Sequence, residues 1–434
     1  MKRLVAVLLA ILIFAATMAG CSKTPTSTDT AVETATAPAT DLQASPDVKN
    51  EDVTITVYAA TSGYSASIDQ IVADYKAATG VTVEWEIPGA DYSTVLKTRF
   101  AADAAPDIFD LDGLAFAAWD ERCADLSDCD FVSHAYSGSL DPATKNGAVH
   151  GMPYAFEGSG IIYNKTMFEA AGIAEIPDTL DELEAACVKL QASGYQPFGE
   201  AWADWGFLMH IFGTPFAYEG DTPELAASLA SGEKKLADLK YMDNFFRLFD
   251  LTVKYGWGKE SVGYNVLTQY GDFAEGKMAM IKQGTWLASY ILSVNPDIKM
   301  GLMAVPLTND PSQTKLMTST SRYLCVNNQS KNVDASKAFL NWLFANLQTY
   351  FVDTLGIMAP YDTMDLTKVT VLNADMFEYS KNDMAYPTFG TLYWPAGFEV
   401  DLATPLQSYI AGDMDQATTI AELQKLYDSR LKTN

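Results

Sequence analysis

Residues 53–58 read Val-Thr-Ile-Thr-Val-Tyr, and this stretch and the residues after it decide the fold class. Its apolar residues alternate with threonines, a pattern typical of a strand with one buried face. After a glycine-containing turn, residues 68–78 place apolar side chains at helical spacing, and Gly80 ends that helix. A second strand at 81–85, a helix at 93–102 and a third strand at 108–109 follow. Strands that alternate with helices predict a parallel sheet and an α/β fold.

The middle of the chain is mainly helical in pattern and contains no visible repeat. Amphipathic spacing and capping residues predict helices at 165–171, 180–193, 242–255, 270–276 and 336–345. Apolar runs predict strands at 160–163 and 278–281, and another strand that ends at Val326.

The composition describes a folded protein of two or three domains. The 434 residues are 48% hydrophobic and 19% charged, so disorder of the whole chain is excluded. The chain has 55 acidic and 29 basic side chains, with a net charge of −26. Nucleic acid or an anionic bilayer as the main ligand would need a basic surplus, so we expect a neutral or cationic ligand and no nucleic acid.

Residues 1–20 have the features of a secretory signal, because Lys2 and Arg3 precede an apolar run at 4–16. As a helix this run is about 20 Å long, too short for a bilayer core of about 30 Å. The ending Met-Ala-Gly-Cys at 18–21 resembles the lipobox of bacterial lipoproteins, which implies that Cys21 is diacylated and begins the mature chain. The alternative is an ordinary cleaved signal with a chance cysteine. Residues 21–50 are rich in Ser, Thr, Ala and Pro without an aromatic, and predict a flexible tether.

The remaining cysteines do not have the spacing of a metal site. No Cys-x-x-Cys occurs, and the three histidines are scattered at 134, 150 and 210, so we expect no metal and no cofactor. Cys123 and Cys129 are close enough to form a disulfide in an oxidising compartment, and the sequence leaves that pairing open. Cys187 and Cys325 lie in apolar patterns and are expected to be buried free thiols.

Several segments together carry a family resemblance. They are Ala-Pro-Asp-Ile-Phe at 105–109, the run 147–154 followed by 162–165, the run 273–280 followed by Gly-Thr-Trp at 284–286, and Ser-Lys-Asn at 330–332. Over residues 51–434 the chain resembles the family 1 extracellular solute-binding proteins of carbohydrate ABC transporters, which are maltose-binding-protein-like.

The resemblance implies a two-lobe, periplasmic-binding-protein-like α/β fold of type II, with hinge strands that cross between the lobes near 157–160, 319–324 and 361–364. Lobe one would comprise 51–157 and 325–360, and lobe two 161–320 and 365–434. The ligand would lie between the lobes at the strand ends.

The resemblance also implies a function. The protein would be a monomer, anchored by lipid at the extracellular face of the cytoplasmic membrane, that captures an oligosaccharide and delivers it to an ABC permease without chemistry. The long Ser/Thr tether favours the Gram-positive arrangement over the Gram-negative one.

A sugar site needs acceptors for hydroxyls and flat aromatic platforms for C–H faces. By resemblance Trp286 stacks on the sugar in lobe two, and either Trp202 or Trp205 faces the ligand from a loop. Trp394 is a comparable candidate, although any of these rings could instead pack in the core. The polar candidates are Asp110, Asp112, Glu157 and Arg322, and Tyr64 is a weaker aromatic candidate.

Each polar candidate has an alternative role. Asp110 and Asp112 follow the strand at 108–109 and could accept a hydroxyl pair, or form a solvated or capping loop. Glu157 could contact the sugar or pair with Arg322 at the hinge, and Arg322 could donate to a hydroxyl or pair with a hinge carboxylate.

Two other functions compete with sugar capture. Paired carboxylates and aromatic platforms also describe a secreted glycoside hydrolase, which is the serious rival. A calcium-dependent adhesin is favoured by the acidic surplus, but the chain has no twelve-residue calcium loop. Gly-x-Ser-x-Gly, His-Glu-x-x-His and Walker motifs are absent from the sequence.

Overall fold

The computed structural model describes residues 52–59, 65–87, 92–113, 116–136 and 138–432. The predictions for the signal segment 1–20, for Cys21, for the tether 21–50 and for Tyr64 lie outside these residues.

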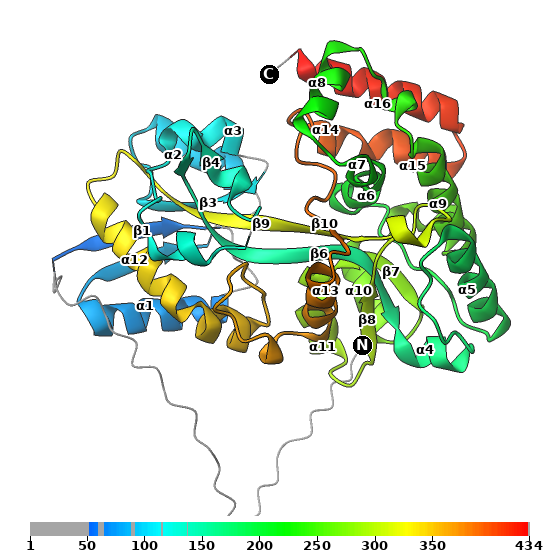
Figure 1. Cartoon of the computed structure of the whole chain (residues 1–434), viewed down its shortest axis with the longest axis horizontal. Helices are drawn as coiled ribbons and strands as arrows, with labels where there is room; N and C mark the ends of the chain where they lie inside the picture. Colours follow the sequence, from blue (N-terminus) through cyan, green and yellow to red (C-terminus); the bar gives the residue numbers. More distant parts are fainter. Residues whose placement is uncertain (1–51, 60–64, 88–91, 114–115, 137, 433–434) are drawn as a thin grey trace, which may run out of the picture. The chain divides into compact units, whose positions relative to one another are not determined.

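A mixed sheet forms the centre of the described part of the chain (Figure 1). Its strand order is β2-β1-β3-β9-β6-β7, with β8 paired to β6 and β10 paired to β9. β1 pairs in parallel with β2 and β3, which confirms the parallel arrangement predicted from the first strands. The other long pairings, β3 with β9 and β9 with β6, are antiparallel. The strands are β1 (Thr54–Tyr58), β2 (Thr82–Glu86), β3 (Ile108–Asp112), β6 (Met152–Asn164), β7 (Met280–Gly284), β8 (Met300–Met303), β9 (Leu316–Val326) and β10 (Ala385–Tyr386); β4 (Thr144–Lys145) and β5 (Ala148–Val149) form a separate ribbon.

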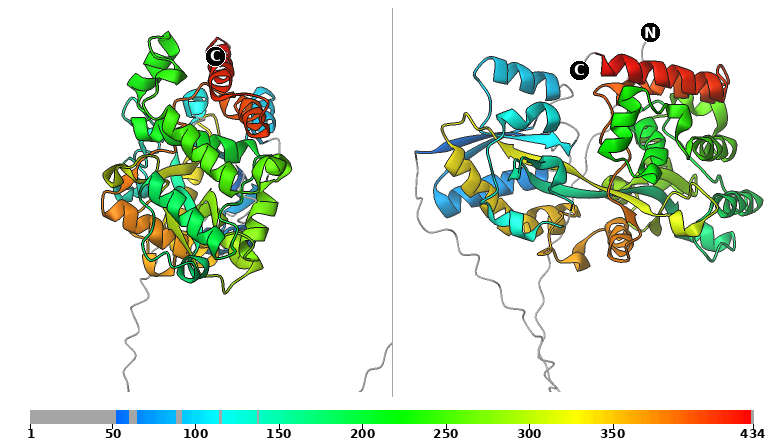
Figure 2. Two further views of the ribbon diagram at one scale, coloured as in Figure 1. Left: turned by 90° about the vertical axis from the view of Figure 1, so that its right-hand side faces the viewer. Right: turned by 45° about the horizontal axis from the view of Figure 1, so that its top comes forward.

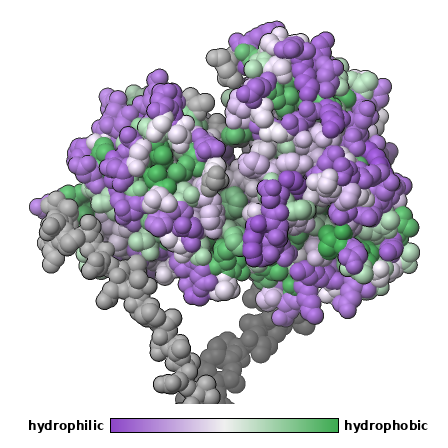
Figure 3. All heavy atoms as spheres, viewed as in Figure 1, coloured by the Kyte–Doolittle hydropathy of each residue, from purple (hydrophilic) through white to green (hydrophobic). Residues whose placement is uncertain are grey.

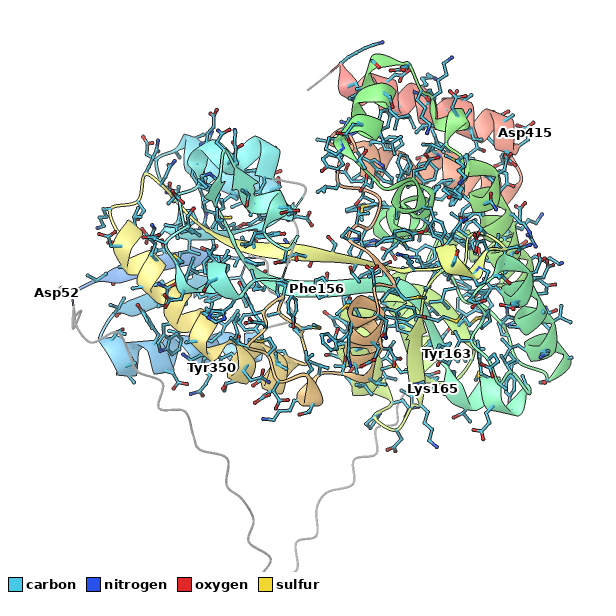
Figure 4. The ribbon with its side chains drawn as sticks, in the orientation of Figure 1. Asp52, Phe156, Tyr163, Lys165, Tyr350 and Asp415 are labelled. Carbon is cyan, nitrogen blue, oxygen red and sulfur yellow. The ribbon has the colours of Figure 1, made fainter. Side chains whose placement is uncertain are left out.

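The strands β6 and β9 are long enough to join two halves of the molecule. Met152 and Tyr154 of β6 are buried with residues of β1 and β3, and Ile161 and Ile162 are buried with residues of β7 and β8. Phe156, labelled in Figure 4, lies midway along β6 where the two halves meet. We call the half around β1–β3 lobe one and the half around β7 and β8 lobe two. The fold is the two-lobe α/β fold predicted from the sequence.

Lobe one has three layers. Ile71 and Tyr75 of α1 and Phe339 of α12 pack on one face of the sheet. Leu96 of α2 and Phe116 of α3 pack on the opposite face, with Phe109 of β3. These helices are α1 (Ser65–Thr79), α2 (Tyr92–Ala101), α3 (Phe116–Trp119) and α12 (Val333–Leu347), the last continued by a π-helical turn at Gln348–Asp353.

Lobe two is mostly helical and has a large aromatic core. Phe212, Phe245 and Phe249 are fully buried there, and α16 packs against α14 and α15 (Figure 2). Its helices are α4 (Lys165–Ala170), α5 (Leu180–Ala192), α6 (Trp205–Phe212), α7 (Thr214–Glu219), α8 (Pro223–Ser231), α9 (Met242–Tyr255), α10 (Val266–Ala274), α11 (Ala288–Val294), α13 (Val371–Lys381), α14 (Phe398–Asp401), α15 (Ala403–Ala411) and α16 (Gln416–Leu431).

The lobe boundaries predicted from sequence stay a prediction. The chain leaves the lobe-one cluster after Tyr361 and Met364, and it joins the lobe-two cluster from Leu366 onward, before Leu372 of α13. Met358, inside the segment assigned to lobe one, is nevertheless buried with Leu372 and Met376. The division into two lobes is therefore less sharp for the buried side chains than for the path of the backbone.

The four cysteines in the described ranges are free and buried. The open question of a Cys123–Cys129 disulfide is answered in the negative, because Cys123 packs beside Phe109 and Trp119 while Cys129 packs in the cluster of Phe131. The predicted burial of Cys187 and Cys325 is confirmed. Within the same ranges, every helix is too short or too polar to span a bilayer.

Candidate functional site

A cavity of about 800 Å³ is lined by residues of both lobes. Its volume lies in the range of small-molecule sites. β6 and β9 contribute Phe156, Glu157 and the run 319–323, lobe one contributes Asp112, and lobe two contributes residues of α6, α11 and the segment 387–392. Figure 3 shows the surface indented between the two halves along the upper edge of the view.

The lobe-two side of the cavity presents three aromatic rings, which we call the aromatic wall: His210, Trp286 and Phe389. The rings of His210 and Trp286 are stacked, with centroids 4.9 Å apart and planes at 28°. Phe389 lies edge-on to both, at 5.5 Å from His210 and 6.0 Å from Trp286. The facing sides of His210 and Trp286 cover each other, so the wall offers a ligand their remaining apolar surface and that of Phe389.

Local backbone geometry fixes Trp286. A side chain at Gly284 would place its Cβ 2.1 Å from the Trp286 ring and 2.5 Å from the Gly158 carbonyl, so only glycine fits at the end of β7. The Trp286 Nε1 donates to Gln283 Oε1 at 3.1 Å, and Gln283 Nε2 donates to Gln269 Oε1 at 2.7 Å. The Gly-Thr-Trp motif thus packs the ring against its own strand and anchors its polar edge in the core.

A second glycine contact fixes Phe389. Gly390 has φ +76°, and a Cβ there would lie 1.8 Å from the carbonyl oxygen of Gly213 between α6 and α7. The buried carboxylate of Asp221 accepts from the Thr388 hydroxyl and from the Leu392 N–H, the latter at 3.2 Å. The segment 388–392 is therefore held against the helices that carry His210.

The wall is uncharged at neutral pH. Burial, and to a lesser extent the nearby Lys282 ammonium, lower the pKa of His210 to about 3. The His210 Nδ1 is buried and has no hydrogen-bond partner. Lys282 itself is buried, donates from Nζ to Ser159 Oγ at 2.6 Å, and has its pKa lowered by burial to about 7. A neutral imidazole in a cavity wall can exchange a hydrogen bond with a ligand hydroxyl.

The lobe-one side of the cavity is charged. Asp112, Glu157 and Arg322 all line it, and Asp112 is opposite Arg322 in the β3–β9 register. The Arg322 Nη1 lies 3.4 Å from Oδ2 of the fully buried Asp110, which also accepts from the Tyr154 hydroxyl at 2.9 Å. Burial raises the pKa of Glu157, while Ser321 and the Arg322 guanidinium oppose that rise. Carboxylates and a guanidinium beside each other supply both acceptors and donors for hydroxyl groups.

Four of the residues predicted from sequence meet in the cavity: Asp112, Glu157, Trp286 and Arg322. Asp110 lies behind Arg322 and orients it, so its direct contact with a ligand is not supported by this geometry.

The prediction for the other three tryptophans is corrected by the structure, because Trp202, Trp205 and Trp394 do not line the cavity. Trp202 is fully buried against Phe207 and Phe249, and Trp394 packs on Phe212 and Phe216. Trp205 is 47% exposed at the start of α6, but it does not line the cavity. Lobe two fills its interior with aromatic residues, so Trp202 and Trp394 complete that core, whereas Trp205 lies on the surface away from the cavity.

The cavity also contains residues that the sequence analysis missed, among them His210, Phe389, Tyr290 and Asn373. His210 lies in an apolar helix and has no motif around it. The sequence did contain a signal for the cavity-lining residues of β9. The run Thr-Ser-Thr-Ser at 318–321 is unusually polar for a strand that crosses a core.

Within the described residues, no group of three or more His, Cys, Asp or Glu side chains is arranged to hold a metal ion. The arrangement combines an uncharged aromatic wall, a charged opposite side and hydroxyl groups along the hinge strand. It is suited to a neutral, polyhydroxylated ligand.

Comparison with known proteins gives one family. The sequence profile described as "Bacterial extracellular solute-binding protein" matches residues 59–348, more than half of the chain. The melibiose/raffinose/stachyose-binding protein MelE of Bacillus subtilis is 26% identical over 379 residues, which cover 82% of this chain and 85% of MelE.

Two solved structures show the same fold. The binding protein RafE in complex with raffinose superposes with a TM-score of 0.75 at 21% identity, covering 87% of this chain and 99% of that one. A sugar transporter of Bacillus licheniformis in complex with stachyose gives a TM-score of 0.68 at 21% identity, over 87% and 100% of the two chains. With the profile match over the two-lobe core, these findings establish that the chain belongs to the bacterial extracellular solute-binding proteins.

Proposed function

We propose that this protein captures an oligosaccharide between its lobes and delivers it to the permease of an ABC importer, without carrying out a reaction. The observation that carries the proposal is the cavity itself, in which the aromatic wall lies opposite Asp112, Glu157 and Arg322. The names of MelE and of the raffinose and stachyose complexes support a galactoside-type oligosaccharide as the ligand class.

The chemistry of the cavity fits a sugar for two reasons. Aromatic rings remove the apolar faces of a pyranose from water, and Trp286 is presented for this by the bare backbone of Gly284. Charged groups form stronger hydrogen bonds with hydroxyls than neutral groups do, and Glu157 and Arg322 supply an acceptor and a donor.

The topology supports capture by closure. Only β6, β9 and the segment that leads to α13 connect the lobes in the described part, so small backbone changes there can reorient one lobe on the other. A sugar that contacts both lobes binds the closed form more tightly and shifts the population toward it. The permease would recognise that closed form.

The place of action follows from the N-terminal segment. We propose that residues 1–20 are a cleaved signal, that Cys21 carries two acyl chains, and that residues 21–50 tether the binding domain to the membrane. Two acyl chains give stable anchoring where one is marginal. The protein would act as a monomer at the extracellular face of the cytoplasmic membrane, in the Gram-positive arrangement, and bind no nucleic acid.

Isothermal titration calorimetry of the purified protein with melibiose, raffinose, stachyose, maltose- and xylan-type oligosaccharides tests the proposal. We expect saturable binding of at least one galactoside, weakened about tenfold or more in Trp286→Ala, which corresponds to about 1.4 kcal/mol. Trp205→Ala, which changes an exposed ring outside the cavity, serves as the matched control and should bind normally.

The glycoside hydrolase remains the alternative because two carboxylates, Asp112 and Glu157, line the same cavity. Following the release of reducing ends in the titrated samples separates the two functions. Binding without new reducing ends supports the transport protein, whereas turnover that is lost in Glu157→Gln would replace it with the enzyme.

A further inference from the structure

The helical segment after β7 presents a stripe of side chains to the cavity. Trp286, Ser289, Tyr290 and Ser293 all line it, and their spacing of three and four residues places them along one side of the segment Thr285–Val294. We call these four residues the α11 stripe. Trp286 belongs to the aromatic wall already described, but the other three extend the cavity surface beyond it.

Tyr290 has the properties of a second platform. It lines the cavity and is 46% exposed, so much of its side chain is left uncovered. The Tyr290 ring lies beside the ring of Tyr270 of α10, with centroids 5.5 Å apart and planes at 36°. Four residues of helix advance about 6 Å, so Tyr290 follows Trp286 at a distance comparable to one pyranose unit.

A buried polar group lies near Ser289, because the Ser289 Oγ donates to the Leu355 carbonyl at 3.1 Å and Asn373 binds the next carbonyl along the chain. Asn373 in the first turn of α13 is only 3% exposed and lines the cavity. Its Nδ2 donates to the Gly356 carbonyl at 2.6 Å, but its Oδ1 has no hydrogen-bond partner. A buried acceptor without a donor is costly, and a ligand hydroxyl would satisfy it.

We propose that Tyr290, with Ser289, Ser293 and Asn373, forms an outer subsite that binds an additional sugar unit of a longer oligosaccharide. The inference rests on the proposed function and deepens it, because it assigns the chain length that the cavity selects. Trp286 would hold one unit in every ligand, and Tyr290 would hold the next unit along the chain, which a monosaccharide lacks.

The test is a chain-length series of galactose, melibiose and stachyose, titrated calorimetrically into wild type, Tyr290→Ala, Tyr290→Phe and Val294→Ala. Val294 lies on the same helix, is 48% exposed and does not line the cavity, so it controls for loss of an exposed apolar side chain. Thermal unfolding of each variant confirms that it is folded.

We expect Tyr290→Ala to weaken melibiose and stachyose binding about tenfold and galactose binding less than about twofold, with Tyr290→Phe and Val294→Ala close to wild type. Equal affinities of wild type and Tyr290→Ala at every chain length would overturn the subsite while leaving sugar capture intact. An equal loss for all three sugars would also overturn it, because Tyr290 would then act on the whole cavity. Wild type that binds none of the sugars would overturn the proposed galactoside function and the subsite together.

Discussion

Gly284 decides where the Trp286 ring lies. A methyl group at this position would lie 2.1 Å from the ring and 2.5 Å from the Gly158 carbonyl, and neither contact is possible without movement. Since the ring covers its own strand, the platform depends on a residue that never touches the ligand.

Gly284→Ala is therefore expected to lower sugar affinity about tenfold by displacing Trp286, with destabilisation of about 1–3 kcal/mol from overpacking. Calorimetric titration and thermal unfolding measure the two effects. Gly206→Ala is the matched control, since no atom lies within 4 Å of a Cβ there. Wild-type affinity in Gly284→Ala would show that the position of the ring does not matter.

Glu200 lies outside the cavity and contributes to the pH dependence of stability. Its carboxyl is 2% exposed, and burial raises its pKa to about 8, partly opposed by the Trp257 backbone. The folded protein keeps this proton between pH 4.5 and about 8, whereas the unfolded chain releases it. The stability that this group contributes is thus present below pH 4.5 and is lost as the pH rises through 8.

Glu200→Gln should remove this loss, because an amide stays neutral at every pH. We expect the variant to exceed wild type in free energy of unfolding by on the order of 4 kcal/mol at pH 8, with the difference shrinking to about 1 kcal/mol at pH 5. Urea unfolding across this range, with the exposed Glu169→Gln as control, measures it. Parallel curves for wild type and Glu200→Gln would contradict the assignment.

At the scale of elements, the segment 388–392 matters because it brings Phe389 to His210. Its attachment depends on Asp221, the acceptor for Thr388 and Leu392. Asp221→Ala should loosen this segment and weaken sugar binding about fivefold, since Phe389 would no longer be held against the wall.

Calorimetry of Asp221→Ala beside Asp250→Ala checks this expectation. Asp250 accepts from the Tyr409 hydroxyl at 2.7 Å on an exposed face of α9, so its loss removes a comparable hydrogen bond without touching the cavity. The attachment would be refuted by Asp221→Ala binding sugar as tightly as Asp250→Ala.

The elements that the sequence predicted are those with strong periodicity. The helices at 180–193 and 242–255 appear as α5 and α9 within one residue, because each has one apolar face. α6 and α7 were missed, since Leu208, Phe212 and Phe216 are buried on nearly every side and leave no periodic pattern. β6 is much longer than the predicted 160–163. Its central residues are shared by both lobes and are buried without the alternation of buried and exposed side chains that marks a strand in a sequence.

The candidate site was predicted where a motif fixes local geometry, and missed where packing decides. Gly-Thr-Trp found Trp286 because the glycine and the ring are coupled within three residues. Trp202 and Trp394 look similar in the sequence, but Phe207, Phe249 and Phe216 come from other elements and bury them. His210 could not be found, because its exposure to the cavity depends on how α6 meets β7 and the segment 388–392.

At the scale of the whole molecule, lipid attachment is a separate and testable part of the account. Cys21→Ala should abolish incorporation of labelled palmitate in cells and move the protein from the membrane fraction to the soluble fraction. Cys187→Ala is the control, since that thiol is fully buried in lobe two. Labelled palmitate on the Cys21→Ala protein would refute the anchor without affecting the account of binding.

The proposed function requires that the sugar bind in the cavity between the lobes. A crystal structure of the protein with stachyose tests it most directly. We predict a sugar ring against Trp286, hydroxyls within hydrogen-bond distance of Glu157 and Arg322, and a further unit beside Tyr290. Stachyose bound elsewhere on the protein, with this cavity filled by water alone, would contradict the account.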